Sequence, residues 1–224
     1  MEAQGTCAKG FEAVLHAFEA MFDDPQERGA GLCVQVGGQT VVDLWAGVAD
    51  LEGNKPWHHG TLANTFCTIK PLAAVAALML VEEGRLELDA PVARYWPEFA
   101  QGGKGRVTVR QVMTHTSGIP ALRGPNHNAM MYDWEHMVEI LAAEPLWWQP
   151  GTGLGYATTI FGWVIGELIR RVDGREPCTF IHERITRPHD LEVYLGVGEQ
   201  DFERIAHFDA AEGRVGDYYS EDLR

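Results

Sequence analysis

The sequence is short of basic residues, and this shortage excludes two classes of partner. Its 18 lysines and arginines are outnumbered by 32 aspartates and glutamates, which gives 224 residues a formal net charge of −14. A surface of this charge repels nucleic acids and anionic membranes, so we expect neither as a partner. The hydrophobic fraction of 46% is enough for a sizeable core. A small molecule is therefore the expected ligand of a globular protein.

Cysteine is also scarce, and its spacing predicts neither a disulfide framework nor a zinc site. The four cysteines follow no CxxC pattern and stand at Cys7, Cys33, Cys67 and Cys178. Histidines without acidic or cysteine partners at ligand spacing are His58, His59, His182 and His189. The sequence thus predicts no metal and no other cofactor. There is no signal-like N-terminus and no apolar run of the ~18 residues that a membrane span needs, which favours a cytoplasmic location.

A stretch rich in alanine and leucine, residues 62–84, is the centre of the prediction. It begins like a strand and continues as a run of strong helix formers, which indicates a buried helix. Cys67 and Lys70 are three residues apart in its first turn, so both side chains lie on one face. The positive end of a helix lowers the pKa of a thiol and can hold the oxygen of a tetrahedral intermediate. This pair is a candidate nucleophile and base.

The N-terminal third predicts a helix followed by a β-hairpin. Apolar residues recur at helical spacing over residues 8–22. Two β-rich runs, 32–36 and 40–45, flank Gly37-Gly38, whose glycines suit a tight turn. Residues 46–60 are rich in turn formers and predict a loop leading to the central helix.

The rest of the chain predicts mainly helices. We expect irregular structure over 84–99, a flexible tip at 101–105, and a short helix from Thr108, which forms a capping box with Gln111. The hydrophobic spacing and the helix-ending signals predict further helices over 133–143, 158–171 and 176–186.

Several motifs occur together in a specific order. After the Cys67–Lys70 pair come Leu88–Val92 with Tyr95-Trp96-Pro97, then Val107–Gly118, then Pro150-Gly151 ahead of Tyr156. This order resembles the serine β-lactamase and penicillin-binding-protein superfamily, most closely its class C-like esterases and acyltransferases. The resemblance implies an α+β, β-lactamase/transpeptidase-like fold, in which helices flank an antiparallel sheet and a helical lobe completes the molecule.

The resemblance also implies the site residues. The family's Ser-x-x-Lys motif matches Cys67 and Lys70, with a cysteine in place of the serine, and its tyrosine motif matches Tyr156. Thr158 stands at the third position of the tyrosine motif and keeps a hydroxyl there but no amide. A thiol is a stronger nucleophile than a hydroxyl, so a covalent acyl-enzyme stays chemically reasonable. The lost amide places esterase or acyltransferase activity above β-lactamase activity.

Other side chains near these motifs have simpler interpretations. Trp147 and Trp148 are candidates to line the substrate pocket, although tryptophans pack in cores as often. His115 and Ser117 suggest a catalytic pair at first sight. They are almost adjacent at the end of a capped helix, where side chains usually bond to the local backbone, so a structural role is the preferred interpretation.

One family motif, a Lys-Thr-Gly or His-x-Gly on an edge strand, is not found in the sequence, and we expect the family's C-terminal strands to be missing from it. We divide the chain into residues 1–66 with the first helix and hairpin, 67–190 with the central helix and helical lobe, and 191–224 as an incomplete return to the sheet. The hypotheses are a second polypeptide that supplies the strands, from cleavage of a precursor or from a separate gene, or a sequence that is a piece of a longer chain.

The sequence therefore predicts an enzyme that forms an acyl-enzyme at Cys67 and acts on an ester, thioester or amide. Cys67, Lys70 and Tyr156 are the catalytic candidates, while Thr158, Trp147 and Trp148 are the candidates for substrate binding. Two alternatives stay open. The chain is a non-catalytic binding or regulatory relative that lost the serine, or Cys67 is an engineered replacement.

Overall fold

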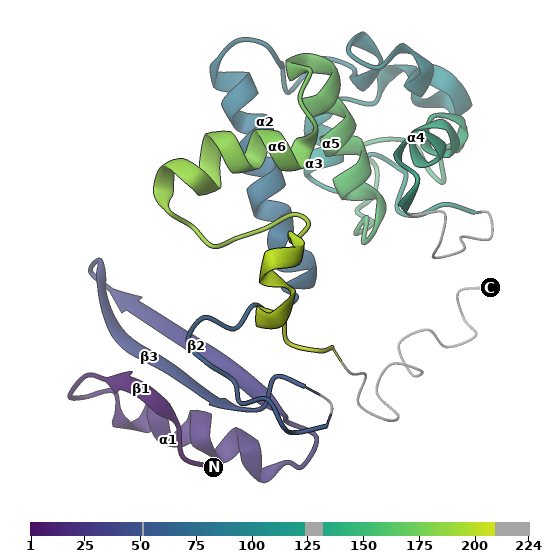
Figure 1. Ribbon diagram of the computed structural model, residues 1–224. Coiled ribbons are helices and arrows are strands. Elements are labelled where there is room, and N and C mark those ends of the chain that lie inside the picture. The colour runs from purple at the N-terminus through teal and green to yellow at the C-terminus, as the bar shows by residue number, and fades with distance from the viewer. Residues whose placement is uncertain (51, 124–131, 209–224) are drawn as a thin grey trace. The chain divides into compact units, whose positions relative to one another are not determined.

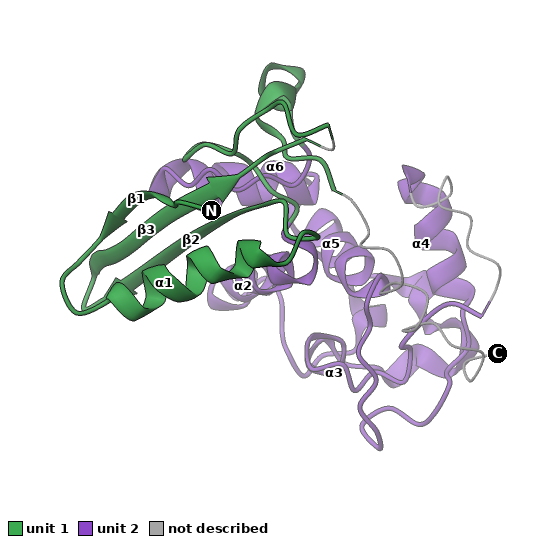
Figure 2. Ribbon diagram, turned by 90° about the horizontal axis from the view of Figure 1, so that it is seen from below, with its two compact units in different colours: residues 1–64, 197–224 green, residues 65–196 purple. Residues whose placement is uncertain are grey.

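The computed structural model describes residues 1–50, 52–123 and 132–208, which form two compact units. Unit 1 consists of residues 1–64 together with the described residues from Val197 onward, and unit 2 consists of Thr65–Gly196 (Figure 2). The predicted return to the sheet, residues 191–224, lies partly outside the described residues. Each unit has its own hydrophobic core, so the two are described separately.

Unit 1 contains a three-stranded antiparallel sheet in the order β1-β3-β2 (Figure 1). Its strands are β1 (Gln4–Cys7), β2 (Gly29–Val36) and β3 (Gln39–Gly47). The predicted hairpin is confirmed. Gly37 and Gly38 join β2 to β3 with φ values of +59° and +78°, which residues with a Cβ rarely adopt.

Helix α1 (Glu12–Ala20) covers one face of this sheet and confirms the first predicted helix. Phe18 is buried against Val42 and Leu44 of β3, and the ring of Phe22 packs edge-on against Phe18. Strand β1 was not predicted, because four residues show no alternation that could be recognised. Its Gly5 has a φ of +112°, and a Cβ there would collide with the backbone carbonyl oxygen of Asp43.

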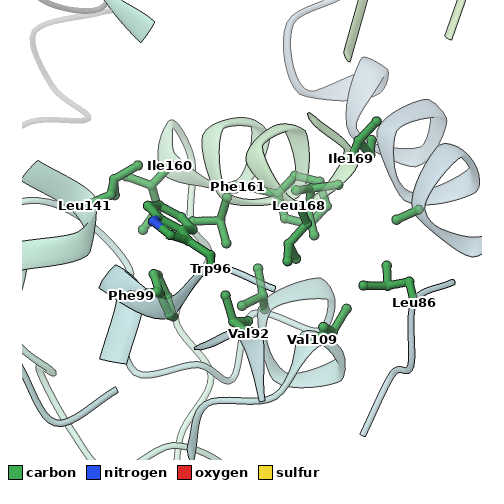
Figure 3. Packing of buried hydrophobic residues seen from close by; sticks show 14 of the residues in the cluster. Leu86, Val92, Trp96, Phe99, Val109, Leu141, Ile160, Phe161, Leu168 and Ile169 are labelled. Carbon is green, nitrogen blue, oxygen red and sulfur yellow. The ribbon is translucent and has the colours of Figure 1, made fainter. Parts of the chain in front are cut away.

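The described residues of unit 2 form helices joined by loops, and they pack around one large core. Its α-helices are α2 (Lys70–Glu82), α3 (Val109–Met113), α4 (Trp134–Ala143), α5 (Ile160–Asp173) and α6 (Pro177–Ile181), with a π-helical turn at His182–Thr186. Short 3₁₀ helices occupy residues 92–94 and, on either side of a kink at residues 101–103, residues 97–106. Trp96 and Phe99 stack in the core beneath α5, where Phe161 and Leu168 point toward Val92 and Val109 (Figure 3).

The predicted helix ends agree with the structure. Thr108 and Gln111 form the capping box of α3, each side chain bonding to the other's backbone N–H at 3.2 and 3.0 Å. Asp133 caps α4 by accepting from the N–H of His136. Gly174 ends α5 with a φ of +91°. These caps depend on residues close in sequence, which is why they could be predicted.

A buried ion cluster joins α4 to α5. The carboxylate of Glu167 is completely buried and accepts hydrogen bonds from Trp134, Arg170 and Arg171 at 2.9, 2.8 and 2.6 Å. Burial alone would raise the pKa of Glu167, but these donors outweigh it and the pKa is lowered. Glu167 is therefore held as a charged, fully satisfied carboxylate.

Two predictions about unit 2 were wrong in part. Residues 101–105 are not a flexible tip, since Lys104 is wholly buried and its Nζ donates to the carbonyl oxygens of Ala142, at 2.9 Å, and Glu144. The glycines around it hid this, because they usually indicate exposed loops. Helix α2 is not buried all round. Ala76, Ala77 and Leu80 are buried, whereas Val75 and Leu78 are more than two-fifths exposed.

In the described part of the chain, no helix combines the length and apolar character that crossing a membrane requires.

Candidate functional site

Cys67 lies in a 3₁₀ helix, Phe66–Ile69, directly before α2 begins at Lys70. The prediction had placed it in the first turn of the α-helix itself. A 3₁₀ helix has three residues per turn, so side chains three apart are in line, and this brings Cys67 and Lys70 closer than α-helical geometry would. Phe66, just before the thiol, has a φ of +45°. Such a conformation is costly for a residue with a large side chain and is often found at functional sites.

The amine of Lys70 donates a hydrogen bond to the sulfur of Cys67, with 3.0 Å between Nζ and Sγ. This bond, followed by one from Tyr156, lowers the pKa of the Cys67 thiol. Burial alone would lower the pKa of Lys70, but its hydrogen bonds to Cys67 and Tyr156 outweigh burial and the pKa is raised. Both shifts favour transfer of the thiol proton to the amine. The resting pair is thus biased toward a thiolate and an ammonium ion.

Tyr156 reaches this pair from the loop that precedes α5. The Nζ of Lys70 lies 4.9 Å from the centre of the Tyr156 ring. Nearly half of the Tyr156 side chain is exposed, so a ligand can approach it from solvent. The structure therefore brings Cys67, Lys70 and Tyr156 together, although Tyr156 is 86 residues beyond Lys70 in the sequence.

His115 contacts Tyr156, and the sequence gave no reason to expect it. The predicted local backbone bonds were wrong for this side chain. Its Nδ1 accepts from the N–H of Ala157 at 3.2 Å, and its ring centre is 4.6 Å from that of Tyr156. Burial, followed by the charge of Lys70, lowers the pKa of His115. Ser117 does bond locally, accepting weakly from the N–H of Ile119 at 3.4 Å.

The two tryptophans predicted to line the pocket have different surroundings. The indole of Trp147 donates to Ala121 and Glu144 and lies beneath Arg123, 4.6 Å from its guanidinium. Trp148 packs against the loop that carries Tyr156. A Cβ on Gly155 would collide with its ring, and its indole N–H bonds to the carbonyl of Gly153 at 3.4 Å. Trp148 thus shapes the loop just ahead of Tyr156. Thr158, the third predicted contact, is exposed two residues after Tyr156.

A small apolar cavity of about 90 Å³ adjoins Lys70 inside unit 2. It is lined by residues of α2, α5 and α6, among them Ala73, Phe161, Gly162 and Ile181. Gly162 faces open space, since a Cβ built on it would meet nothing within 4 Å. Across the described ranges no three side chains from His, Cys, Asp and Glu gather as a metal site would require.

Comparison with known proteins identifies the family of this chain. The family model described as Beta-lactamase matches residues 15–218. The esterase/beta-lactamase LipL of Mycobacterium tuberculosis is 36% identical over 196 residues, which cover 86% of this chain and 44% of LipL. A penicillin-binding protein homolog from Caulobacter crescentus has a TM-score of 0.89 and 36% identity, over 95% of this chain and 57% of that one.

A family VIII carboxylesterase has a TM-score of 0.86 and 38% identity, covering 93% of this chain and 58% of its own. The chain thus spans about half the length of these relatives. Their mixed fold, with an antiparallel sheet and many helices, confirms the predicted fold class. With the sequence match and two structural matches in agreement, this chain belongs to the beta-lactamase family, among relatives that include esterases and penicillin-binding-protein homologues.

Proposed function

We propose that this chain carries the nucleophilic part of an esterase or acyltransferase that forms an acyl-enzyme on Cys67. The observation that carries the proposal is the 3.0 Å contact between Lys70 Nζ and Cys67 Sγ, with the thiol pKa lowered and the amine pKa raised. A thiolate is the reactive form of cysteine. Because both pKa shifts favour a thiolate beside the ammonium of Lys70, attack on a carbonyl depends less on a further base.

In the first step the thiolate attacks the carbonyl carbon of an ester. A sulfur–carbon bond forms and the carbonyl oxygen takes up the negative charge. The backbone N–H of Cys67 lies in the first turn of a helical segment, where N–H groups have no partner within the helix, and it serves as one donor to this oxyanion. The ammonium of Lys70 adds a positive charge beside the reacting atoms.

In the second step the bond from the carbonyl carbon to the leaving oxygen breaks. The departing alkoxide takes a proton from the Tyr156 hydroxyl, and Lys70 returns its proton to Tyr156, so an alcohol leaves and a thioester stays on Cys67. Water, an amine or a thiol then attacks the thioester, and the same groups carry its proton in the opposite direction. Thioesters react readily with amines and thiols, so acyl transfer competes with hydrolysis.

The relatives support a carboxylic ester as the substrate class, because LipL and the family VIII carboxylesterase carry esterase names. Thr158 offers a hydroxyl near Tyr156 but no amide, which favours esters, thioesters or simple amides over β-lactams. Trp147 and Trp148 are proposed as parts of the pocket wall. The four cysteines are free thiols, as a reducing compartment such as the cytoplasm would keep them.

Intact mass spectrometry after incubation with p-nitrophenyl acetate tests the proposal. We expect one acetyl group per chain, located on the peptide that contains Cys67, and no such group in Cys67→Ala. Cys33→Ala is a matched control, since Cys33 is exposed and lies outside the site. It should acetylate at Cys67 as fast as the wild type.

Equal absence of acetylation in wild type and Cys67→Ala would favour the alternative, a binding or regulatory relative without catalysis. Cys67→Ser addresses the origin of the thiol. If the serine variant turns over esters far faster than the wild type, the cysteine is a replacement in a serine site. A slower serine variant supports a site adapted to the thiolate.

The proposal includes a partner segment for the sheet. Among the described strands, β2 pairs only with β3, so its other edge of eight residues has backbone groups available for pairing. We propose that further strands pair there, supplied by a continuation of this chain or by a second polypeptide. Gel filtration with intact mass analysis tests this. A well-folded, fully active 24.9 kDa monomer would contradict it.

A further inference from the structure

We propose that His115 is a positioning residue that holds the Tyr156 hydroxyl against Cys67 and Lys70. The inference rests on the proposed function, since it assigns Tyr156 a role at the thiolate, but it concerns a residue outside the proposed catalytic groups. His115 acts through the backbone and the ring of Tyr156 rather than on the reacting sulfur itself.

His115 holds the chain on both sides of Tyr156. Its carbonyl oxygen accepts from the N–H of Gly155 at 3.0 Å, and its Nδ1 accepts from the N–H of Ala157 at 3.2 Å. One residue therefore binds the backbone N–H groups of both residues that flank the tyrosine. A loop residue secured at both neighbours has little freedom in the direction of its side chain.

The imidazole also supports the tyrosine ring directly. The ring of His115 lies between Tyr156 and Phe161, with centre distances of 4.6 and 5.2 Å. Phe161 is buried in α5, so it provides a rigid base for the stack. Trp148 packs against Gly155, the residue before the tyrosine. Tyr156 is thus oriented by a stack that begins in the core of unit 2.

The backbone of His115 has a strained conformation that this role explains. Its φ is +58°, which is uncommon for a residue with a side chain and costs roughly 1 kcal/mol. The neighbouring backbone fixes it there, because the N–H of Thr116 donates to Gln111 and the N–H of Gly151 donates to Thr116, both at 2.8 Å. Histidine, like asparagine and aspartate, adopts this conformation more often than most residues that have a side chain. Its imidazole then accepts the bond from the N–H of Ala157, which an aliphatic side chain at this position could not do.

The role requires a neutral imidazole. Nδ1 must accept a hydrogen bond from Ala157, so the ring proton resides on Nε2. Burial and the charge of Lys70 lower the pKa of His115, which keeps the ring neutral near pH 7. The groups that face the ring are Lys70 from α2, Tyr156 from the loop and the uncharged Phe161 from α5. Protonation in acid would place an N–H against the N–H of Ala157 and release the loop.

The test measures the reactivity of Cys67 in the full chain, and it requires no turnover. The rate of carboxamidomethylation of Cys67 by iodoacetamide, followed by peptide mass from pH 5 to 10, reports the apparent pKa of the thiol. The variants are Tyr156→Phe, His115→Ala, the double variant and His115→Asn. Asparagine suits the left-handed backbone and offers an oxygen near the position of Nδ1, so it is the conservative variant. Thermal unfolding checks that each variant is folded.

We expect Tyr156→Phe to slow alkylation at pH 7 about threefold or more, and His115→Ala to slow it by a similar factor. The double variant should be no slower than Tyr156→Phe, because both changes remove the same contribution. His115→Asn should recover most of the rate. A folded His115→Ala variant that reacts like the wild type, while Tyr156→Phe is slow, would overturn the inference and leave the proposed function intact.

Amide hydrogen exchange distinguishes failure of the proposed function from failure of the inference about His115. If neither Lys70→Met nor Tyr156→Phe alters alkylation, the proposed function fails. The positioning role of His115 is then judged by the amide of Ala157. This amide should exchange at least tenfold faster in His115→Ala than in the wild type, and the slow exchange should return in His115→Asn. Unchanged exchange at Ala157 would by itself reject the positioning role.

Discussion

Two lysines in unit 2 show what decides the chemistry of a buried amine. Lys104 is wholly buried and donates to the carbonyl oxygens of Ala142 and Glu144 at the end of α4. Burial lowers its pKa to about 8, and the charge of Glu144 opposes that fall. Lys70 is only partly buried, but its partner is a thiol, and its pKa is raised.

The difference lies in the partner rather than in the depth of burial. Carbonyl oxygens cannot exchange a proton with Lys104, so its amine completes the C-terminus of α4 and has a structural role. The thiol of Cys67 can give up its proton, so each partner stabilises the charged form of the other. The more deeply buried lysine is therefore the weaker candidate for catalysis. This comparison leads to four predictions.

The largest expected effect is on stability. Lys104→Ala leaves two buried carbonyl groups without their donor and opens a cavity, which should lower the free energy of unfolding by about 3 kcal/mol. Urea denaturation followed by circular dichroism measures it. Lys104→Met keeps most of the volume and should lose less, while Lys70→Ala should stay within about 1 kcal/mol of the wild type. A larger loss for Lys70→Ala would reverse the assignment of roles.

The second effect is the pH dependence that Lys104 contributes to stability. Its pKa is about 8 in the folded state, against about 10.4 in an unfolded chain. Between these values the unfolded chain binds the additional proton, so stability rises with pH by at most about 1.4 kcal/mol per pH unit. The stability of the wild type relative to Lys104→Met should therefore increase from pH 8 to 10 and be flat below pH 7. A difference that shrinks with rising pH contradicts this sign.

The raised pKa of Lys70 gives the opposite dependence of stability on pH. The stabilisation from Lys70 is present at lower pH and is lost as the pH rises through the pKa of the folded state.

The third prediction concerns the thiol of Cys67, whose charged form the ammonium of Lys70 stabilises. Lys70→Met should raise the apparent pKa of Cys67 and slow its alkylation at pH 7 about tenfold, since one pKa unit corresponds to a tenfold change in thiolate. Lys104→Met is the control and should leave the alkylation profile unchanged.

The smallest effect concerns the cavity beside Lys70. Gly162→Ala places a methyl group where nothing lies within 4 Å and replaces a glycine inside α5. We expect a gain in stability of about 0.5–1 kcal/mol, measured by thermal unfolding. The alkylation profile of Cys67 should move less than in Lys70→Met. If Gly162→Ala shifts the alkylation profile as much as Lys70→Met does, then packing around the amine of Lys70, rather than its contact with the thiol, sets the pKa of that amine.

The predictions that agreed with the structure depend on neighbours in sequence. The capping box of Thr108 and Gln111, the glycine stop at Gly174 and the Gly37-Gly38 hairpin each need only a few consecutive residues. The pairing of Cys67 with Lys70 belongs with them, because a spacing of three residues aligns the side chains in any tight helix. Strand β1 was not predicted, because it pairs with residues of β3 about forty positions away and this pairing leaves no local pattern in the sequence.

The sequence by itself determined the helix ends and the thiol–amine pair, since periodicity and short spacings encode these features, and the order of its motifs indicated the class of the fold through the resemblance to a known family. Only the tertiary structure decided which lysine is buried and what each one meets. It also decided that His115 reaches across 42 positions to the loop of Tyr156. The physical reason is that burial and charge depend on what surrounds a side chain in space, and those surroundings come from distant segments that no local pattern identifies.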